Sequence, residues 1–395
     1  MRPTALDQLP EPDATARAHG ERVVAHLREA IADAGGALPF DRFMELALYA
    51  PGLGYYSAGA RRFGRDGDFV TAPELSPLFG RCLAAQAVEV LEALGGGELL
   101  ELGAGRGTLA TDLLEALADA GRLPERYLIL ELSGALREEQ QAMLARRVPH
   151  LLNRVQWLDA LPADGFRGLV FGNEVADALP VSRFRIGADG VVEEAYVTTA
   201  GDGFAWAWQP AGPELVAGVA AIRSEVGPLS PGYTSELCLR LAPWVATLAA
   251  PLAAGALLLI DYGYPRREYY LPERADGTLR CHYRQRAHGD PLRLAGLQDI
   301  TAHVDFTALA EAGHAAGLAV AGYTTQAHFL LGCGLDGLLA ESDPNDTAAH
   351  LALMQQVRAL TLPGEMGERF QALALTRGLD RPLRGFALRD LRGRL

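Results

Sequence analysis

The chain has 395 residues and is 49% hydrophobic, so it is long enough to bury one large core or to form two domains. Its net charge of −13 argues against nucleic acid as a partner, because a phosphate backbone attracts basic surfaces. The sequence contains no lysine, which excludes Walker-A nucleotide hydrolases, protein kinases and pyridoxal phosphate enzymes, because each needs one.

The cysteines and the apolar runs indicate a reduced, cytoplasmic protein. Four cysteines lie far apart without a C-x-x-C pair, so we expect neither a disulfide framework nor a bound metal. The first residues lack the apolar run of a signal peptide and are too acidic for a transit peptide. The longest apolar stretches, such as Ala253–Ile260, are too short to span a bilayer.

Residues 1–80 are predicted to form an N-terminal extension of helices and loops. Helical periodicity runs over 17–34, where Gly35 and Gly36 end it, and again over Pro39–Tyr49. A further helix over 76–94 leads into the first strand of a sheet.

The loop Arg65–Glu74 precedes that helix. It could close over a cofactor through Thr71 and Glu74; an ordered surface loop is the alternative.

Residues 98–108 read Glu-Leu-Leu-Glu-Leu-Gly-Ala-Gly-Arg-Gly-Thr and predict a strand, a tight turn and a helix. The dinucleotide fingerprint G-x-G-x-x-G would need glycine where Thr108 stands, so NAD is disfavoured. S-adenosylmethionine (SAM) has no pyrophosphate, and its methionine amine could be held by Glu101. We predict a SAM site lined by Glu101, Thr108 and the glycines Gly103, Gly105 and Gly107.

Two more strands extend this cofactor site. Tyr127–Glu131 ends in an acid that could bind both ribose hydroxyls of an adenosyl cofactor or of NAD. A third strand, Arg154–Trp157, ends near Asp159, which we expect beside the adenine. A generic α/β turn with surface acids is the less favoured alternative.

The fourth strand, Gly168–Phe171, leads into Asn173, Glu174 and Asp177. Ligands of open parallel sheets bind beyond the carboxyl ends of the strands, so these side chains should lie beside the SAM methyl group. Another strand ends in Asp261 at the same edge. Carboxylates facing a methyl donor suit a cationic acceptor such as a guanidinium; helix capping by Asn173 or Asp177 is the alternative.

The rest of the chain interrupts and then resumes the α/β pattern. The runs within Phe184–Pro210 predict a β-rich insertion, followed by a helix over 234–249 and the strand that ends in Asp261. A long polar loop is expected over 262–303. After it we expect a helix (305–316), strands (319–332) and a C-terminal helical segment.

The segment 297–306 is dense in polar side chains. Asp299, Thr301, His303 and Asp305 could line the acceptor pocket, with His303 among the catalytic residues. Asp305 could instead cap the next helix, and His303 could be a buried histidine with satisfied hydrogen bonds. A metal site is disfavoured because the ligand spacing is absent.

We therefore divide the chain into five parts: the extension 1–80, the SAM-binding half of the core 81–183, the insertion 184–230, the second half of the core 231–335, and the helical segment 336–395.

Six motifs in order carry a resemblance to a known family: GDFVTAPE (67–74), ELGAGRG (101–107), NEVADALPV (173–181), DYG (261–263), QDITAHVDF (298–306) and MGERF (366–370). Over residues 38–375 the chain resembles the MidA family of SAM-dependent methyltransferases. Its mitochondrial members are complex I assembly factors that methylate a protein arginine.

The resemblance implies a class I, Rossmann-like α/β fold with a seven-stranded, mostly parallel sheet. It implies ω-NG arginine methylation of a protein, with a respiratory complex subunit as one candidate. Carried over by motif, the cofactor residues are the three glycines and Glu131, and the acid pair is Glu174 and Asp177. We add Asp261 and His303 as catalytic residues, and Asn173 and Asp159 as cofactor contacts.

One departure from the family pattern bears on the acceptor. Val175 and Ala176 stand where bulky aromatic residues are expected, which could open the acceptor pocket. A small-molecule N- or O-methyltransferase and a SAM-binding assembly chaperone without turnover therefore remain alternatives. The insertion could recognise the acceptor or form a homodimer.

Overall fold

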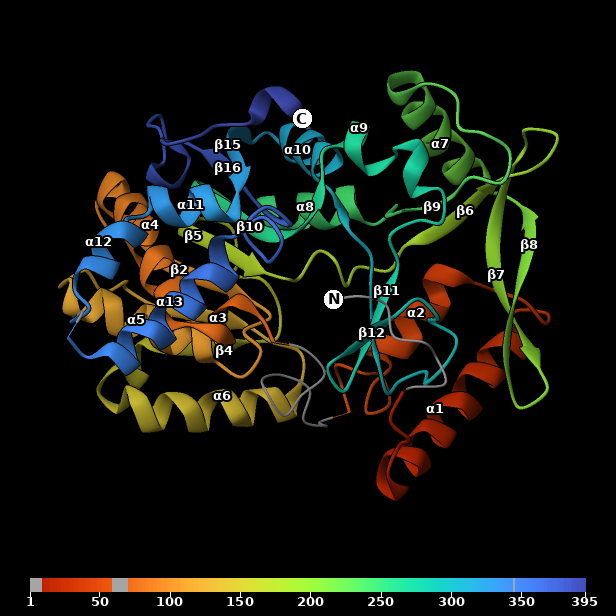
Figure 1. The fold of residues 1–395 in the computed structure, drawn as a ribbon, viewed down its shortest axis with the longest axis horizontal. Coiled ribbons are helices and arrows are strands. Elements are labelled where there is room, and N and C mark those ends of the chain that lie inside the picture. The colour runs from red at the N-terminus through yellow and green to blue at the C-terminus, as the bar shows by residue number, and fades with distance from the viewer. Residues whose placement is uncertain (1–8, 59–69, 344) are drawn as a thin grey trace. The chain divides into compact units, whose positions relative to one another are not determined.

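The computed structural model describes residues 9–58, 70–343 and 345–395 (Figure 1). The chain divides into two compact units, each assembled from several stretches of sequence. Unit 1 comprises Met1–Phe69, Asp177–Leu241 and Tyr264–Asp305. Unit 2 comprises Val70–Ala176, Ala242–Gly263 and Phe306–Leu395.

A mixed sheet of mostly parallel strands forms the centre of unit 2. Seven of them follow one continuous path, β15-β16-β10-β5-β2-β3-β4. The strands from β10 to β4 are parallel, whereas β16 is antiparallel to both of its neighbours. The bounds along the path are β15 Ala319–Thr325, β16 Phe370–Arg377, β10 Leu252–Tyr264, β5 Phe166–Asn173, β2 Glu98–Leu102, β3 Tyr127–Leu130 and β4 Val155–Leu158.

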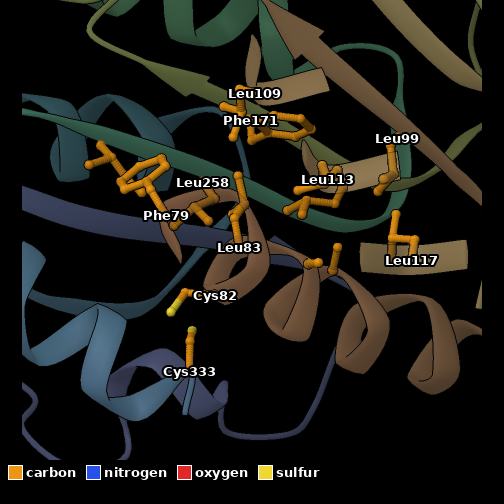
Figure 2. Packing of buried hydrophobic residues seen from close by; sticks show 14 of the residues in the cluster. Phe79, Cys82, Leu83, Leu99, Leu109, Leu113, Leu117, Phe171, Leu258 and Cys333 are labelled. Carbon is orange, nitrogen blue, oxygen red and sulfur yellow. The ribbon is translucent and has the colours of Figure 1, made fainter. Parts of the chain in front are cut away.

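Helices α4 (Pro77–Leu94) and α5 (Thr108–Asp119) bury their apolar faces against the middle of this sheet. Ser76 starts α4 by accepting a hydrogen bond from the Leu78 amide, and Gly95 ends it in the left-handed conformation. Figure 2 shows the resulting core, with side chains of both helices packed among Leu99, Phe171 and Leu258 of the strands. Further helices are α3 Ala72–Leu75, α6 Gly134–Arg147, α8 Leu241–Ala249, α10 Phe306–Ala315, α11 Gln326–Gly332, α12 Leu335–Ala340 and α13 Thr347–Thr361.

The C-terminal part differs from the expectation in two places. The strands expected over 319–332 become strand β15 followed by helix α11, because Thr325 caps the helix by accepting from the His328 amide. The segment expected to be helical over 336–395 contains β16 between β10 and β15. Six successive residues of β16 are buried, and such a run has no alternation to distinguish a strand from a buried helix.

Unit 1 contains the expected β-rich insertion as a five-stranded sheet of order β1-β7-β6-β9, with β8 paired to β7. The helix expected over 234–249 is wrong in its first half, because Thr234–Leu237 pairs with β6 as strand β9. The strands are β1 Leu38–Pro39, β6 Ser182–Ile186, β7 Val192–Ala200, β8 Gly203–Pro210 and β9 Thr234–Leu237, and the helices are α1 Ala14–Asp33, α2 Phe40–Tyr49 and α7 Pro213–Val226.

The long polar stretch 262–303 is also more ordered than expected. It holds helix α9 (Arg266–Tyr269) and a three-stranded antiparallel sheet of β12 (Arg286–His288), β11 (Arg280–Tyr283) and β13 (Asp299–Thr301). These strands have only three or four residues each, too few to show alternation in the sequence. The two-residue strand β14 (Val304–Asp305) follows. Within the described ranges, no helix combines the length and apolar character that crossing a bilayer requires.

Candidate cofactor and acceptor site

The glycine turn between β2 and α5 is the centre of the candidate cofactor site. Gly103, Gly105 and Gly107 have φ values of 60°, 54° and 85°, a region that glycine enters without strain, and α5 begins at Thr108. The predicted strand, turn and helix are confirmed. A Cβ on Gly105 would meet no atom within 4 Å, so the backbone faces open space there.

Glu101 lies inside the core rather than at its edge. The side chain is 2% exposed and its Oε2 accepts a hydrogen bond from the Tyr127 hydroxyl at 2.6 Å. Burial raises the pKa of Glu101 to about 8, so the group is mostly protonated at neutral pH. Its contact with a cofactor amine remains a prediction.

Glu131 directly follows β3 and is held in a fixed position. Oε1 accepts from the Ser133 amide at 2.9 Å and Oε2 from the Gln140 side chain at 3.2 Å. Burial raises its pKa, and these hydrogen bonds partly offset that effect. The carboxylate thus has a set orientation at the carboxyl end of its strand.

Gln140 of α6 is a residue that sequence reasoning missed. Its Nε2 also donates to the Gly105 carbonyl at 2.8 Å, and its Oε1 accepts from the Trp157 indole at 2.8 Å. One amide therefore joins the glycine turn, Glu131 and β4. No local pattern marks it, because its partners are distant in sequence.

Leu132 was also missed, although its position beside an expected ribose acid was a usable signal. Its side chain is 79% exposed, which is unusual for a leucine flanked by buried residues at a strand end. An exposed apolar side chain in this position could contact a flat, apolar ring.

Asp159 follows β4 as expected, but its side chain is 93% exposed and pairs with Arg137 at 2.7 Å. Arg137 also donates to the carbonyls of Glu131 and Leu158, each at 2.6 Å. The arginine therefore ties the ends of β3 and β4 together, and Asp159 lies at the rim of that contact.

Glu74 and Thr108, two of the expected cofactor residues, are brought together. The Thr108 hydroxyl donates to Glu74 Oε1 at 2.5 Å. Thr71 precedes α3 in an extended conformation without a side-chain capping bond. The start of the Arg65–Glu74 loop lies outside the described residues.

The end of β5 contains one of the four non-glycine residues with positive φ in the described ranges. Glu174 has a φ of 55°, although it is not glycine, and its amide donates to the Ile260 carbonyl at 2.9 Å. Asn173 Nδ2 donates to Glu174 Oε1 at 3.0 Å. Among the described residues, the buried Oδ1 of Asn173 has no hydrogen-bond partner.

Asp261 of β10 holds the turn after β5 through hydrogen bonds to backbone amides. Its Oδ2 accepts from the Ala176 amide and its Oδ1 from the Tyr262 amide, both at 2.9 Å, and the side chain is 1% exposed. Val175 lies between these anchors and faces the glycine turn, because a Cβ on Gly103 would lie 3.2 Å from its Cγ1.

The expected acceptor residues of unit 1 form a cluster of their own. Asp177 and Asp299 are buried, and Asp299 Oδ1 accepts from the Tyr56 hydroxyl at 2.8 Å. Burial, with the charges of both acids, raises the pKa of Tyr56 well above 10. The Tyr56 ring stacks on Tyr49, with centroids 5.5 Å apart. Sequence reasoning did not find the two tyrosines.

The remaining candidates of unit 1 have structural contacts. His303 donates its backbone amide to the Thr278 hydroxyl, and its ring lies 5.3 Å from that of Tyr264. Asp305 accepts from Arg266 at 3.2 Å. Thr301 is buried on β13. No group of histidine, cysteine and acidic residues suited to a metal occurs in the part of the chain that the structure describes.

The features of unit 2 fit SAM. The open face over Gly105 accommodates a ligand against the backbone, and Glu131 presents a held carboxylate at the end of the next strand. The Leu132 side chain is exposed and apolar, and Asn173 Oδ1 could accept a hydrogen bond from a ligand. These acceptors match the hydroxyl and ammonium groups of that molecule, which donate hydrogen bonds.

Comparison with known proteins agrees. The family model described as "Putative S-adenosyl-L-methionine-dependent methyltransferase" matches residues 82–324. A solved structure from Burkholderia thailandensis, bound to S-adenosyl-homocysteine, is 47% identical with a TM-score of 0.94 and covers 98% of this chain and 100% of its own.

Curated relatives are more distant. A protein named as a mitochondrial protein arginine methyltransferase of Drosophila melanogaster is 30% identical, over 93% of this chain and 88% of its own. The human protein of that name is 28% identical, over 86% of this chain and 80% of its own. The chain belongs to the MidA-like family of SAM-dependent methyltransferases, as its motifs predicted.

Proposed function

We propose that the protein transfers the methyl group of SAM to a guanidinium nitrogen of an arginine in a partner protein. The names of the curated relatives support the class of acceptor. The observation that carries the proposal is the left-handed Glu174 at the end of β5, where ligands of parallel sheets bind. Strained backbone at such a position is typical of a functional side chain.

The cofactor would supply an electrophilic methyl group on a positively charged sulfur. Glu174 would accept hydrogen bonds from the guanidinium, orient one nitrogen and take up the proton which that nitrogen loses. A carboxylate suits this role because it matches a guanidinium in both charge and geometry. Catalysis of this kind depends mainly on positioning.

Asp261 would act through Glu174 as a positioning residue. Both of its carboxylate oxygens accept backbone amides, and one of those amides belongs to Ala176 in the same turn. We assign cofactor binding to Glu131, the glycine turn, Thr108, Asn173, Glu101, Asp159, Thr71 and Glu74. Catalytic roles for Asp177 and His303 in unit 1 remain predictions.

The test compares Glu174→Gln with the exposed control Glu365→Gln. Each variant is incubated with SAM and arginine-containing peptides, and methylated peptide is measured by mass spectrometry. Glu174→Gln should abolish transfer while S-adenosylhomocysteine affinity stays within about threefold, because loss of a group used only on the acceptor leaves cofactor binding intact.

Retained transfer by Glu174→Gln would remove the role assigned to Glu174. Transfer by the wild type to small amines but to no peptide would move the acceptor to the small-molecule class. Cofactor binding with a stable partner but no turnover would support the chaperone alternative.

We further propose that the acceptor is a folded or nascent protein met in the cytoplasm, and that the insertion around β8 forms a homodimer contact. Deleting 203–210 should then lower the mass measured by light scattering to that of one chain. An unchanged mass would contradict the homodimer contact and favour a role of the insertion in recognising the acceptor.

A further inference from the structure

Helix α5 receives a carboxylate at its start from another part of the chain. Its N-cap, Gly107, has no side chain with which to cap the helix. Instead the hydroxyl of Thr108, the first helical residue, donates to Oε1 of Glu74 at 2.5 Å. Glu74 comes from the short helix α3 and is half-buried.

This places a fixed negative charge at the glycine turn. The free amides and the dipole of a helix N-terminus attract anions, and dinucleotide enzymes bind their pyrophosphate there. Here a side-chain carboxylate is already hydrogen-bonded at that position. A second acid, Asp112, lies one turn further along α5, where Arg147 pairs with it at 2.8 Å.

Arg147 does not neutralise both acids, since its other contact on this helix is Glu115. Burial raises the pKa of Asp112, its contact with Arg147 partly offsets this effect, and the charges of Glu115 and Glu74 add to it. The first turn of α5 is therefore a place where an additional anion would be repelled.

We propose that Glu74 determines the charge preference of the cofactor site: its carboxylate favours a ligand with net positive charge and rejects the diphosphate of a nucleotide. The turn resembles a dinucleotide turn in its glycines but not in its electrostatics. The inference rests on SAM as the cofactor and is independent of the methyl acceptor.

Three ligands separate charge from shape. SAM carries a sulfonium that S-adenosylhomocysteine lacks, whereas the two are otherwise alike, and ADP shares the adenosine but carries a diphosphate. Isothermal titration of each ligand into the wild type and into Glu74→Gln gives the affinities directly. The glutamine keeps an oxygen that can accept from Thr108, so the variant removes charge and little else.

The variant should reduce the ratio of SAM affinity to S-adenosylhomocysteine affinity about fivefold and raise ADP affinity to a similar degree, as loss of a nearby charge in partly screened surroundings does. Both effects should shrink as salt concentration rises. Glu115→Gln, which removes the same charge two turns further along α5, should leave the ratio unchanged.

A merely structural Glu74 gives a different result. It would weaken SAM and S-adenosylhomocysteine equally, with a lower melting temperature and no gain for ADP, and this result would overturn the proposal. Loss of transfer to peptides with an unchanged ligand ratio would count against Glu74 without affecting the proposed acceptor.

Discussion

The turns at the carboxyl ends of β2 and β5 share a backbone conformation but use different residues to adopt it. Both need left-handed backbone. The turn after β2 places glycines there, whereas the turn after β5 places Glu174 there. Glycine adopts this conformation without strain, but a residue with a Cβ loses about 1 to 2 kcal/mol in it.

The difference indicates what each turn supplies. After β2 the backbone itself faces open space at Gly105, and a side chain there would fill that space. After β5 the side chain is retained despite its cost. Contacts from Ile260, Asn173 and Asp261 hold the strained turn in place. A strained residue that several contacts hold in place is better evidence of a functional side chain than an unstrained residue is.

The acid on β2 provides the largest expected effect in this comparison. The pKa of Glu101 is about 8 in the folded protein and about 4.3 in an unfolded chain, so folding takes up a proton between these values. Wild-type stability should therefore fall, relative to Glu101→Gln, as pH rises from about 4.3 to 8, by on the order of several kcal/mol. Urea unfolding of both proteins at several pH values measures the difference, and a difference independent of pH would contradict the raised pKa.

We expect a side chain in the glycine turn after β2 to destabilise the protein, although the turn after β5 carries one at Glu174. Gly107→Ala forces a Cβ at φ 85° and brings it to 3.2 Å from Gln140 Cα, so we expect a loss of about 2 kcal/mol in unfolding free energy. Gly134→Ala, at a helix start with open space, is the control. Equal stabilities of the two variants would show that the turn relaxes.

Glu131 tests whether the β2 and β3 ends share one ligand. Glu131→Ala should weaken S-adenosylhomocysteine binding tenfold or more, about 1.4 kcal/mol, because a held carboxylate is lost. The exposed control Glu365→Ala should leave the affinity unchanged in the same calorimetric titration. Unaltered binding to Glu131→Ala would separate the ribose contact from this residue.

Replacing Glu174 by glycine gives the turn after β5 the same residue type at its left-handed position as the turn after β2. Relief of the left-handed strain should raise the unfolding free energy by about 1 kcal/mol, while methyl transfer disappears. Thermal unfolding measured beside Glu174→Ala, which keeps the Cβ, isolates the backbone term. If glycine destabilises the protein more than alanine does, the turn is not strained.

The smallest effect is expected at Asp159. Its exposed pair with Arg137 should contribute less than about 0.5 kcal/mol, so Asp159→Ala should change the stability of the protein only slightly. A loss of S-adenosylhomocysteine affinity without a change in melting temperature would support the contact with the adenine that we assign to Asp159, and an unchanged affinity would contradict it.

The glycine turn and the parallel strands of unit 2 could be predicted from the sequence, because short stretches of neighbouring residues determine them. A strand ending in glycines and followed by an apolar periodicity fixes the turn at Gly103–Thr108, and the alternation of strands and helices fixes the parallel arrangement of β2 to β5. The carboxyl-edge rule then indicated Glu131 and Glu174 without any structure.

Other features depend on partners far along the chain. Residues Phe370–Arg377 form strand β16 only because β10 and β15 pair with them on either side, and β9 is a strand only because β6 lies beside it. The contacts of Gln140 and the left-handed φ of Glu174 arise from tertiary packing, which no window of sequence contains.

Val175 has a consequence for how this family can vary. A Cβ on Gly172 would lie 2.6 Å from its Cγ2, and one on Gly103 would lie 3.2 Å from its Cγ1, so one side chain fills the space between the two turns. Substitutions at positions 103, 172 and 175 are therefore expected to be epistatic. An aromatic residue introduced at 175 alone would have to move one of the turns, and homologous exchange should succeed only when the set is exchanged together.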